Sequence, residues 1–184
     1  MSQPQHRPAN RQSYSSLPRH QLVVCASLVQ NPTNLGGLCR TAEAFRLEAL
    51  VLADLQLAQN PLFRAVAASS QRWQPLQSCP LAELPTWLQQ QKQQGYAILA
   101  LESHPQAWPL TRFQFPTRSV LLLGQELTGI PPALQGLADW RLTIPQFGLV
   151  ESLNVQTAAA IAAYEYVRQR MGEVGGWGDG AMGR

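Results

Sequence analysis

Short apolar runs alternate with amphipathic segments through the middle of the chain. Five runs rich in Leu, Val and Ile are typical of β-strands: 21–29, 48–54, 96–102, 119–124 and 140–145. Because these runs are mostly apolar at successive positions, both faces of each strand must be covered by other elements. The pattern therefore predicts the α/β class, with a mainly parallel sheet flanked by helices.

The segments between these runs have the spacing of amphipathic helices. Helices are predicted at 35–46, 60–69, 81–94, 131–138 and 152–170. Pro85 interrupts the start of the third helix. The last helix begins at Ser152, a residue type that caps free backbone N–H groups, and continues through a run of alanines that permits close packing.

Three loops that follow predicted strands are rich in glycine and small polar residues. They are "NPTNLGGLCRTA" (31–42), "GQELTGIPP" (124–132) and "PQFGLVESLN" (145–154). In parallel α/β sheets, ligands bind at the carboxyl ends of the strands, in the loops that lead into helices. These three loops are therefore the candidate binding site.

Composition narrows the class of protein. A chain of 184 residues with 45% hydrophobic residues can form one domain with a substantial core. A net charge of +3 and a pI near 9.0 fit a polyanionic partner without requiring one. The three cysteines are odd in number and have no C-x-x-C spacing, which argues against disulfides and zinc and favours a reducing, cytoplasmic setting. No apolar stretch approaches the roughly 18 residues of a membrane span.

The two ends of the chain differ from its middle. Residues 1–20 lack the apolar segment that is typical of secretory signals. They also lack acidic residues, as organelle transit peptides do. Their abundant Gln and Pro favour a disordered basic arm instead. Residues 172–184 contain six glycines and are predicted to be a flexible tail. The folded domain is therefore expected at 21–171.

Common catalytic signatures are missing from the sequence. It has no G-x-G-x-x-G, and the G-x-x-x-x-G that begins at Gly124 has Ile130 and Pro131 in place of the Lys and Ser/Thr of a P-loop. With three histidines, two of them in the arm, neither a His-based metal site nor a Ser-His-Asp triad is expected. The loops instead offer Arg40, Glu126, amides and hydroxyls, which suit nucleoside binding and group transfer by positioning.

The loop sequences resemble a known family. "NPTNLGGLCRTAEAF", "LLLGQELTGI" and "IPQFGLVESLNVQTAAAIAAYE" are similar to the three motifs of the SPOUT-class (SpoU/TrmH-type) RNA 2′-O-ribose methyltransferases, in the same order and spacing. The resemblance covers residues 21–170. Within the class, "NLGGLCRT", "QRWQPL" and "GYAILALE" are most similar to the enzymes that methylate guanosine 18 of tRNA, especially the large eukaryotic ones.

This resemblance implies a SPOUT fold with a C-terminal deep trefoil knot. It also implies an obligate homodimer that binds S-adenosylmethionine in the knot, uses no metal, and completes each active site across the interface. The implied substrate is RNA, with tRNA as the expected class. The alternatives are a 2′-O-methyltransferase of ribosomal RNA or of another tRNA position, and a catalytically silent RNA-binding protein of the same fold.

Matching the motifs position by position assigns roles to nine residues. The implied catalytic residues are Arg40, Asn34, Glu126, Ser152 and Asn154. The implied cofactor-binding residues, which contact the adenosine mostly through their backbone, are Leu101, Gly124, Ile144 and Leu153. Because a guanidinium stays protonated, Arg40 is expected to bind a neighbouring RNA phosphate and stabilise alkoxide charge rather than remove the proton.

Each assignment has a structural alternative. Arg40 would otherwise be a surface residue of an amphipathic helix, Ser152 and Asn34 would be helix caps, and Glu126 would hydrogen-bond its own turn. In the basic arm, Arg7, Arg11 and Arg19 are candidate RNA contacts.

Overall fold

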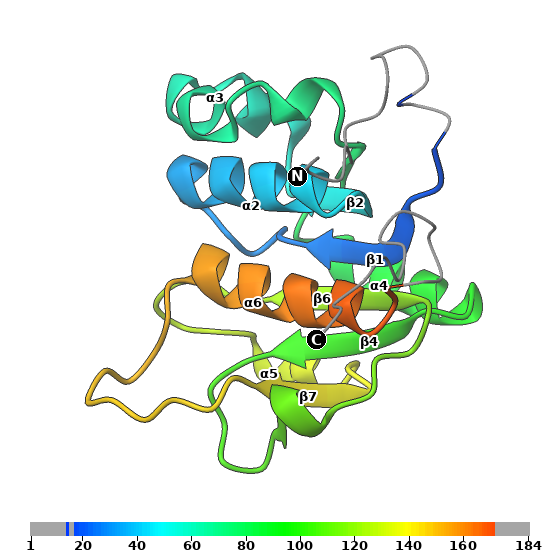
Figure 1. Ribbon diagram of the computed structural model, residues 1–184, viewed down its shortest axis with the longest axis vertical. Coiled ribbons are helices and arrows are strands. Elements are labelled where there is room, and N and C mark those ends of the chain that lie inside the picture. The colour runs from blue at the N-terminus through cyan, green and yellow to red at the C-terminus, as the bar shows by residue number, and fades with distance from the viewer. Residues whose placement is uncertain (1–13, 15–16, 172–184) are drawn as a thin grey trace, which may run out of the picture.

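The computed structural model describes Tyr14 and residues 17–171, shown as a ribbon in Figure 1. Its strands are β1 (His20–Cys25), β2 (Leu47–Leu52), β3 (Leu76–Ser78), β4 (Ala97–Leu101), β5 (Trp108–Pro109), β6 (Ser119–Leu123) and β7 (Trp140–Thr143). They form a parallel seven-stranded sheet in the order β3-β2-β1-β6-β4-β7-β5. The α/β class and the parallel sheet expected from the sequence are confirmed.

Helices cover both faces of the sheet. They are α2 (Pro32–Ala44), α3 (Pro61–Ala67), α4 (Leu84–Gln93), α5 (Pro132–Gln135) and α6 (Val155–Arg168). Three shorter helical segments are η1 (Leu55–Gln59), η2 (Ser70–Arg72) and η3 (Leu110–Arg112). The apolar side chains of α2, α3 and α6 belong to one core cluster, and those of α4 and α5 belong to a second, on the opposite face. In Figure 1, α2 and α6 lie side by side in front of the sheet.

Successive residues of the central strands alternate between the two clusters. In β6, Leu121 and Leu123 belong to the cluster of α2 and α6, whereas Val120 and Leu122 belong to the cluster of α4 and α5. This is the two-residue period of a strand that is buried on both faces. The central strands are thereby fixed from both sides, so their carboxyl ends form a rigid base for the loops that follow.

The starts of two helices correct the capping predictions. Asn31, not Asn34, caps α2, because its side chain accepts a hydrogen bond from the Thr33 backbone N–H at 2.9 Å. Asn154, not Ser152, caps α6, because its Oδ1 accepts from the backbone N–H groups of Gln156 and Thr157 at 2.9 and 3.3 Å.

Two short strands were missed. β3 has three residues, two of them exposed, and β5 has two, so neither carries the apolar run by which strands were recognised. The first strand was also predicted too long, because residues 26–29 leave the sheet after Cys25 while remaining buried.

Most of the two predicted tails, residues 1–13, 15–16 and 172–184, lies outside the described residues. At the end of the basic arm, Arg19 forms an ion pair with Glu43 at 3.3 Å and donates to the backbone carbonyls of Trp73 and Leu47 at 2.7 and 3.1 Å. Arg19 is therefore held on the domain by these contacts, and its role as an RNA contact stays a prediction. None of the helices in the described part of the chain is long and apolar enough to span a membrane.

Candidate active site

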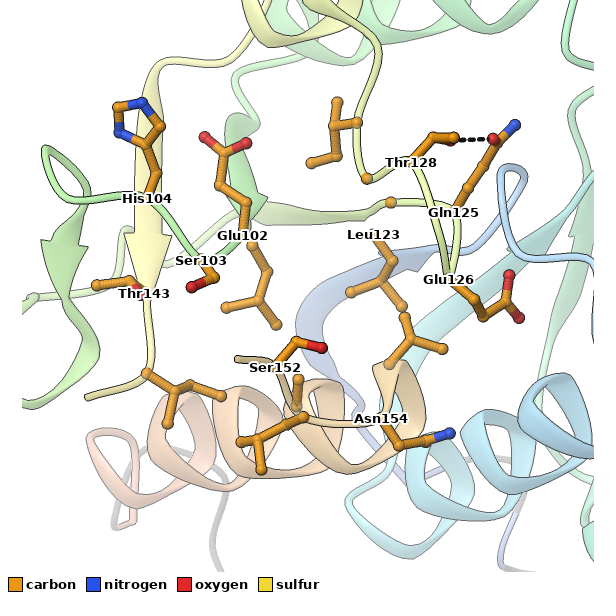
Figure 2. Close-up of a pocket in the computed structure, with 18 of the residues that line it drawn as sticks. Glu102, Ser103, His104, Leu123, Gln125, Glu126, Thr128, Thr143, Ser152 and Asn154 are labelled. Atoms are coloured by element: carbon orange, nitrogen blue, oxygen red, sulfur yellow. Dashed lines mark hydrogen bonds between the residues drawn. The ribbon is translucent and has the colours of Figure 1, made fainter. Parts of the chain in front are cut away.

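A pocket of about 600 Å³ opens at the carboxyl ends of β4, β6 and β7. Its walls are residues 101–104 at the end of β4 and beyond it, 123–130 at the end of β6 and beyond it, and 143, 144 and 146 at the end of β7 and beyond it, together with Gln135, residues 152–155 and Ala158. This volume lies within the range of small-molecule and cofactor sites. The site is therefore at the edge of the sheet that the loop composition indicated, and Figure 2 shows its polar side chains.

The wall that follows β6 depends on two glycines. A Cβ atom on Gly124 would lie 2.6 Å from the carbonyl carbon of Gly129, so only glycine fits this close backbone approach. Gly129 has φ +69°, in the left-handed region that favours glycine. The backbones of Gln125 and Gly129 exchange two hydrogen bonds, at 2.9 and 3.1 Å, that close the loop. The wall is thus a fixed turn of backbone with its polar groups near the pocket.

A chain of hydrogen bonds joins the three candidate loops. Asn34 Nδ2 donates to Glu126 Oε1 at 3.1 Å, and Asn154 Nδ2 donates to Asn34 Oδ1 at 3.0 Å. The backbone N–H of Asn31 also donates to Glu126 Oε1, at 3.3 Å. The structure therefore brings Asn34, Glu126 and Asn154 together from segments that are far apart in the sequence.

Glu126 is held as a carboxylate by this network. Partial burial acts to raise its pKa, but hydrogen bonds from Asn34 and from backbone N–H groups of Glu126, Asn31 and Gln30 outweigh it. The net pKa of Glu126 lies below its ordinary value. The side chain is therefore ionised at neutral pH and keeps Asn34 oriented as a donor.

The other residues implied by the resemblance fall into two groups. Leu101, Gly124, Ile144, Leu153 and Ser152 line the pocket. Arg40 does not: it is exposed on α2, about 9 Å along the helix axis from Asn34 at the usual rise per residue. Within the described residues, the side chain of Arg40 makes no hydrogen bond or ion pair. The roles of all nine residues stay predictions, since position alone does not test them.

Sequence reasoning missed the loop after β4, which supplies Glu102, Ser103 and His104. Glu102 pairs with Arg141 and accepts from Gln135 Nε2 at 3.0 Å, so β4, β7 and α5 are cross-linked beside the pocket. The signal was available, because these polar residues directly follow a buried strand. They were missed because this segment, unlike the other three loops, contains no glycine.

The two pocket carboxylates lie apart. In Figure 2, Glu126 is near α2 and Asn154, whereas Glu102 is on the opposite side with His104 and Thr143. Glu102 has Arg141 as a cationic partner, while Glu126 is paired with amides. No group of three His, Cys, Asp or Glu side chains in the described residues could hold a metal ion. The arrangement suits an uncharged or cationic organic ligand.

Fold and pocket together define an α/β protein with a ligand-sized pocket at the carboxyl edge of a parallel sheet. The chain belongs to the SpoU rRNA Methylase family, which it matches over residues 21–164.

Its similarity to individual proteins points to RNA-modifying enzymes. It is 41% identical over 151 residues to the tRNA (guanosine(18)-2′-O)-methyltransferase TARBP1 of Mus musculus, covering 82% of this chain and 10% of that one. It is 37% identical over 163 residues to the tRNA (guanosine(18)-2′-O)-methyltransferase of Saccharomyces cerevisiae, covering 88% and 11%. The chain thus spans about a tenth of the length of these two relatives.

The fold also matches a solved structure. The crystal structure of the A. aeolicus TrmH/SpoU tRNA modifying enzyme superimposes with a TM-score of 0.77 at 26% identity, covering 89% of this chain and 82% of that one.

Proposed function

We propose that this chain transfers a methyl group from S-adenosylmethionine to a ribose 2′-hydroxyl of RNA, with guanosine 18 of tRNA as the target. The observation that carries the proposal is the bonded chain Asn154–Asn34–Glu126 beside a pocket of about 600 Å³. It links the three segments whose sequences resemble the motifs of 2′-O-methyltransferases. The names of the mouse and yeast relatives support guanosine 18.

The pocket fits S-adenosylmethionine in size and chemistry. Leu101, Ile144 and Leu153 offer apolar surface for an adenosine, and Gly124 allows close approach of the backbone. The ionised Glu126 suits a cationic ligand. When bound, S-adenosylmethionine supplies an electrophilic methyl group on a positively charged sulfur.

The residues of the chain must orient the ribose hydroxyl and stabilise the charge that develops on its oxygen. A guanidinium does this well, because it donates several hydrogen bonds and stays protonated. Arg40 is the candidate, but it lies away from the pocket of its own chain. We therefore infer that Arg40 acts on the pocket of a second copy.

A homodimer is supported by apolar side chains near the pocket. Leu127 lines the pocket and is 98% exposed, and Phe147 and Leu149, in the loop between β7 and α6, are 98% and 104% exposed. Such exposed apolar side chains are typical of surfaces that bind a protein partner. A second copy that covers them would also bring its own residues to the pocket.

We also infer the deep trefoil knot and a cytoplasmic setting. After β6, the chain passes through α5 on one face of the sheet, forms β7 beyond β4, and returns through α6 on the other face. This path around β4 supports a knot. Three free, buried cysteines support a reducing compartment.

Ribosomal RNA is the second candidate substrate, because the family to which the chain belongs is described as rRNA methylases. The same site chemistry serves both substrates. The nucleotide that accepts the methyl group distinguishes them.

Labelled methyl transfer to unmodified tRNA and rRNA transcripts tests the proposal. A 2′-O-methyl product protects the adjacent phosphodiester from alkali, which separates it from base methylation. Arg40→Ala should lower turnover by about a hundredfold or more, with unchanged S-adenosylhomocysteine binding. Arg112→Ala, at another exposed arginine, is the matched control and should stay active. Near-normal turnover of Arg40→Ala would refute its role, and alkali-labile product would refute ribose methylation.

A further inference from the structure

A closed ring of hydrogen bonds lies beside the pocket, where three elements meet. Gln135 ends α5, Arg141 lies in β7, and Glu102 follows the last residue of β4. Gln135 Nε2 donates to Glu102 Oε2 at 3.0 Å, and Arg141 donates to Glu102 Oε1 and, at 3.0 Å, to Gln135 Oε1. Each of these side chains is therefore bonded to the other two, and the two charged members form an ion pair.

Gln135 makes one further bond, which connects the ring to the wall that follows β6. Its Nε2 group also donates to the backbone carbonyl of Ile130 at 2.9 Å. Ile130 is the last residue of that wall, and its side chain is 3% exposed. A glutamine amide has two N–H donors, so both donors of Gln135 are used by groups of the chain. The side chain is therefore fixed in place, and its donors are not available to a ligand.

The 125–130 turn is held near both of its ends. Its internal backbone hydrogen bonds keep its shape but do not attach it to the sheet. Near its start, the side chain of Glu126 is bonded to Asn34 of α2 at 3.1 Å. At its end, the Ile130 carbonyl is bonded to Gln135. The place of this turn at the pocket, and with it the place of the Glu126 carboxylate, therefore depends on the Gln135 amide as well as on Asn34.

The ring is a firm point of attachment because it bridges strands that are not neighbours. In the sheet, β4 lies between β6 and β7, so the ring connects the loop after β6 to both β4 and β7. The side chains of Glu102 and Arg141 are 11% and 33% exposed. Hydrogen bonds to charged groups are stronger than those between neutral groups, and partial burial strengthens them further. A movement of the turn relative to β4 and β7 must therefore break strong bonds.

We propose that Gln135 is a positioning residue for methyl transfer, which acts by holding the 125–130 turn and Glu126 in place at the pocket. This inference rests on the proposed function, because it takes S-adenosylmethionine as the occupant of the pocket. It gives a role to a residue outside the nine to which the resemblance assigns one. The amide acts through its two donors, so a side chain of similar size without them should let the turn leave its binding position.

Ligand binding tests the proposal without any turnover. Calorimetric titration with S-adenosylhomocysteine, well below the melting temperature of each variant, measures binding to the folded chain. Gln135→Met keeps similar volume without the amide and should weaken this ligand by about fivefold or more, because the Ile130 carbonyl loses its donor. Gln93→Met is the matched control, since Gln93 is also the last residue of a helix, α4, and is exposed outside the pocket walls. This control should bind like the unsubstituted chain.

A second variant gives a readout that a purely structural role would not produce. Gln135→Glu keeps an acceptor for Arg141, but as a carboxylate it has no donor and lies beside the carboxylate of Glu102. A neighbouring like charge raises the pKa of a carboxyl group, and the protonated form regains one O–H donor. The binding deficit of Gln135→Glu relative to the unsubstituted chain should therefore shrink as the pH falls from about 8 to about 5. The deficit of Gln135→Met should stay constant, since the charged and titratable groups on this side of the pocket, Glu102, Arg141 and His104, are the same in both variants.

The outcomes separate the role of Gln135 from the proposed function. Equal affinities of the unsubstituted chain and both variants would overturn the role of Gln135, and so would a deficit of Gln135→Glu that does not change with pH. A lower melting temperature with unchanged affinity would likewise show that the ring only stabilises the fold. If Gln135→Met does not fold, the pH profile of Gln135→Glu decides the question alone. Failure of the unsubstituted chain to bind S-adenosylhomocysteine would instead refute the proposed function.

Discussion

Replacing Gly124 with alanine should distort the pocket while leaving the rest of the domain folded. The added Cβ would lie 2.6 Å from the carbonyl carbon of Gly129 and 2.8 Å from both the Cα of Gly129 and the backbone nitrogen of Ile130. All three are backbone atoms, so no side-chain rotation relieves the clash. Relieving the clash therefore requires an outward movement of the 125–130 turn.

The size of the effect follows from where the strain is relieved. Overpacking by one carbon in a tight site costs about 1 to 3 kcal/mol. If the turn keeps its position, this cost lowers the melting temperature by about 2 to 12 °C for a chain of this size. If the turn moves, the pocket is distorted instead, and the affinity for S-adenosylhomocysteine falls by roughly 5- to 150-fold.

Thermal unfolding measures the melting temperature of the variant, and calorimetric titration of the same preparation measures its affinity for S-adenosylhomocysteine. Gly136→Ala is the matched control, since its Cβ would be no closer than 3.7 Å to any neighbouring atom and its backbone is helical. It should be neutral or slightly stabilising. If Gly124→Ala retained both the melting temperature and the affinity of the unsubstituted chain, the close backbone approach could not be what shapes the pocket.

Two further predictions concern titratable groups. Hydrogen bonds hold the pKa of Glu126 below its ordinary value, so its stabilising contribution is present above about pH 4.3 and is lost as the pH falls through the lowered pKa. In denaturant titrations, Glu126→Gln should therefore lower the free energy of unfolding more at pH 7 than at pH 3. An equal loss of unfolding free energy at the two pH values would contradict the pairing of Glu126 with Asn34. Burial raises the pKa of Cys25 to about 12 and that of Cys39 to about 11. At a given pH near neutrality, each thiol is therefore at least about a hundredfold less ionised than an exposed cysteine. Ellman's reagent at pH 8 should label both slowly until the chain is unfolded, and rapid labelling of the native protein would show that they are accessible.

Much of the fold could be predicted because its strands are buried on both faces. Apolar runs such as 119–124 mark β6 directly. The start of α2 was predicted at residue 35, three residues after its actual start at Pro32, because the cap at Asn31 was not recognised. β5 could not be recognised, because two residues at the edge of a sheet are defined by pairing with β7 and not by their own pattern. Short edge strands are fixed by tertiary contacts.

The location of the site could be predicted from the sequence more fully than the contacts between its side chains. The carboxyl-end rule and the loop composition placed Glu126 and Asn154 at one pocket, where the structure has them. Sequence could not show that Asn34 lies between them, since that depends on how α2 packs against α6.

The most direct test of ribose methylation at guanosine 18 uses two tRNAs that differ in one hydroxyl group. One carries guanosine at position 18, and the other carries 2′-deoxyguanosine there. With labelled S-adenosylmethionine, the first should accept one methyl group, mapped by mass spectrometry to the ribose of nucleotide 18, and the second should accept none. Equal labelling of both, or a methyl group mapped to a base, would contradict the proposed function.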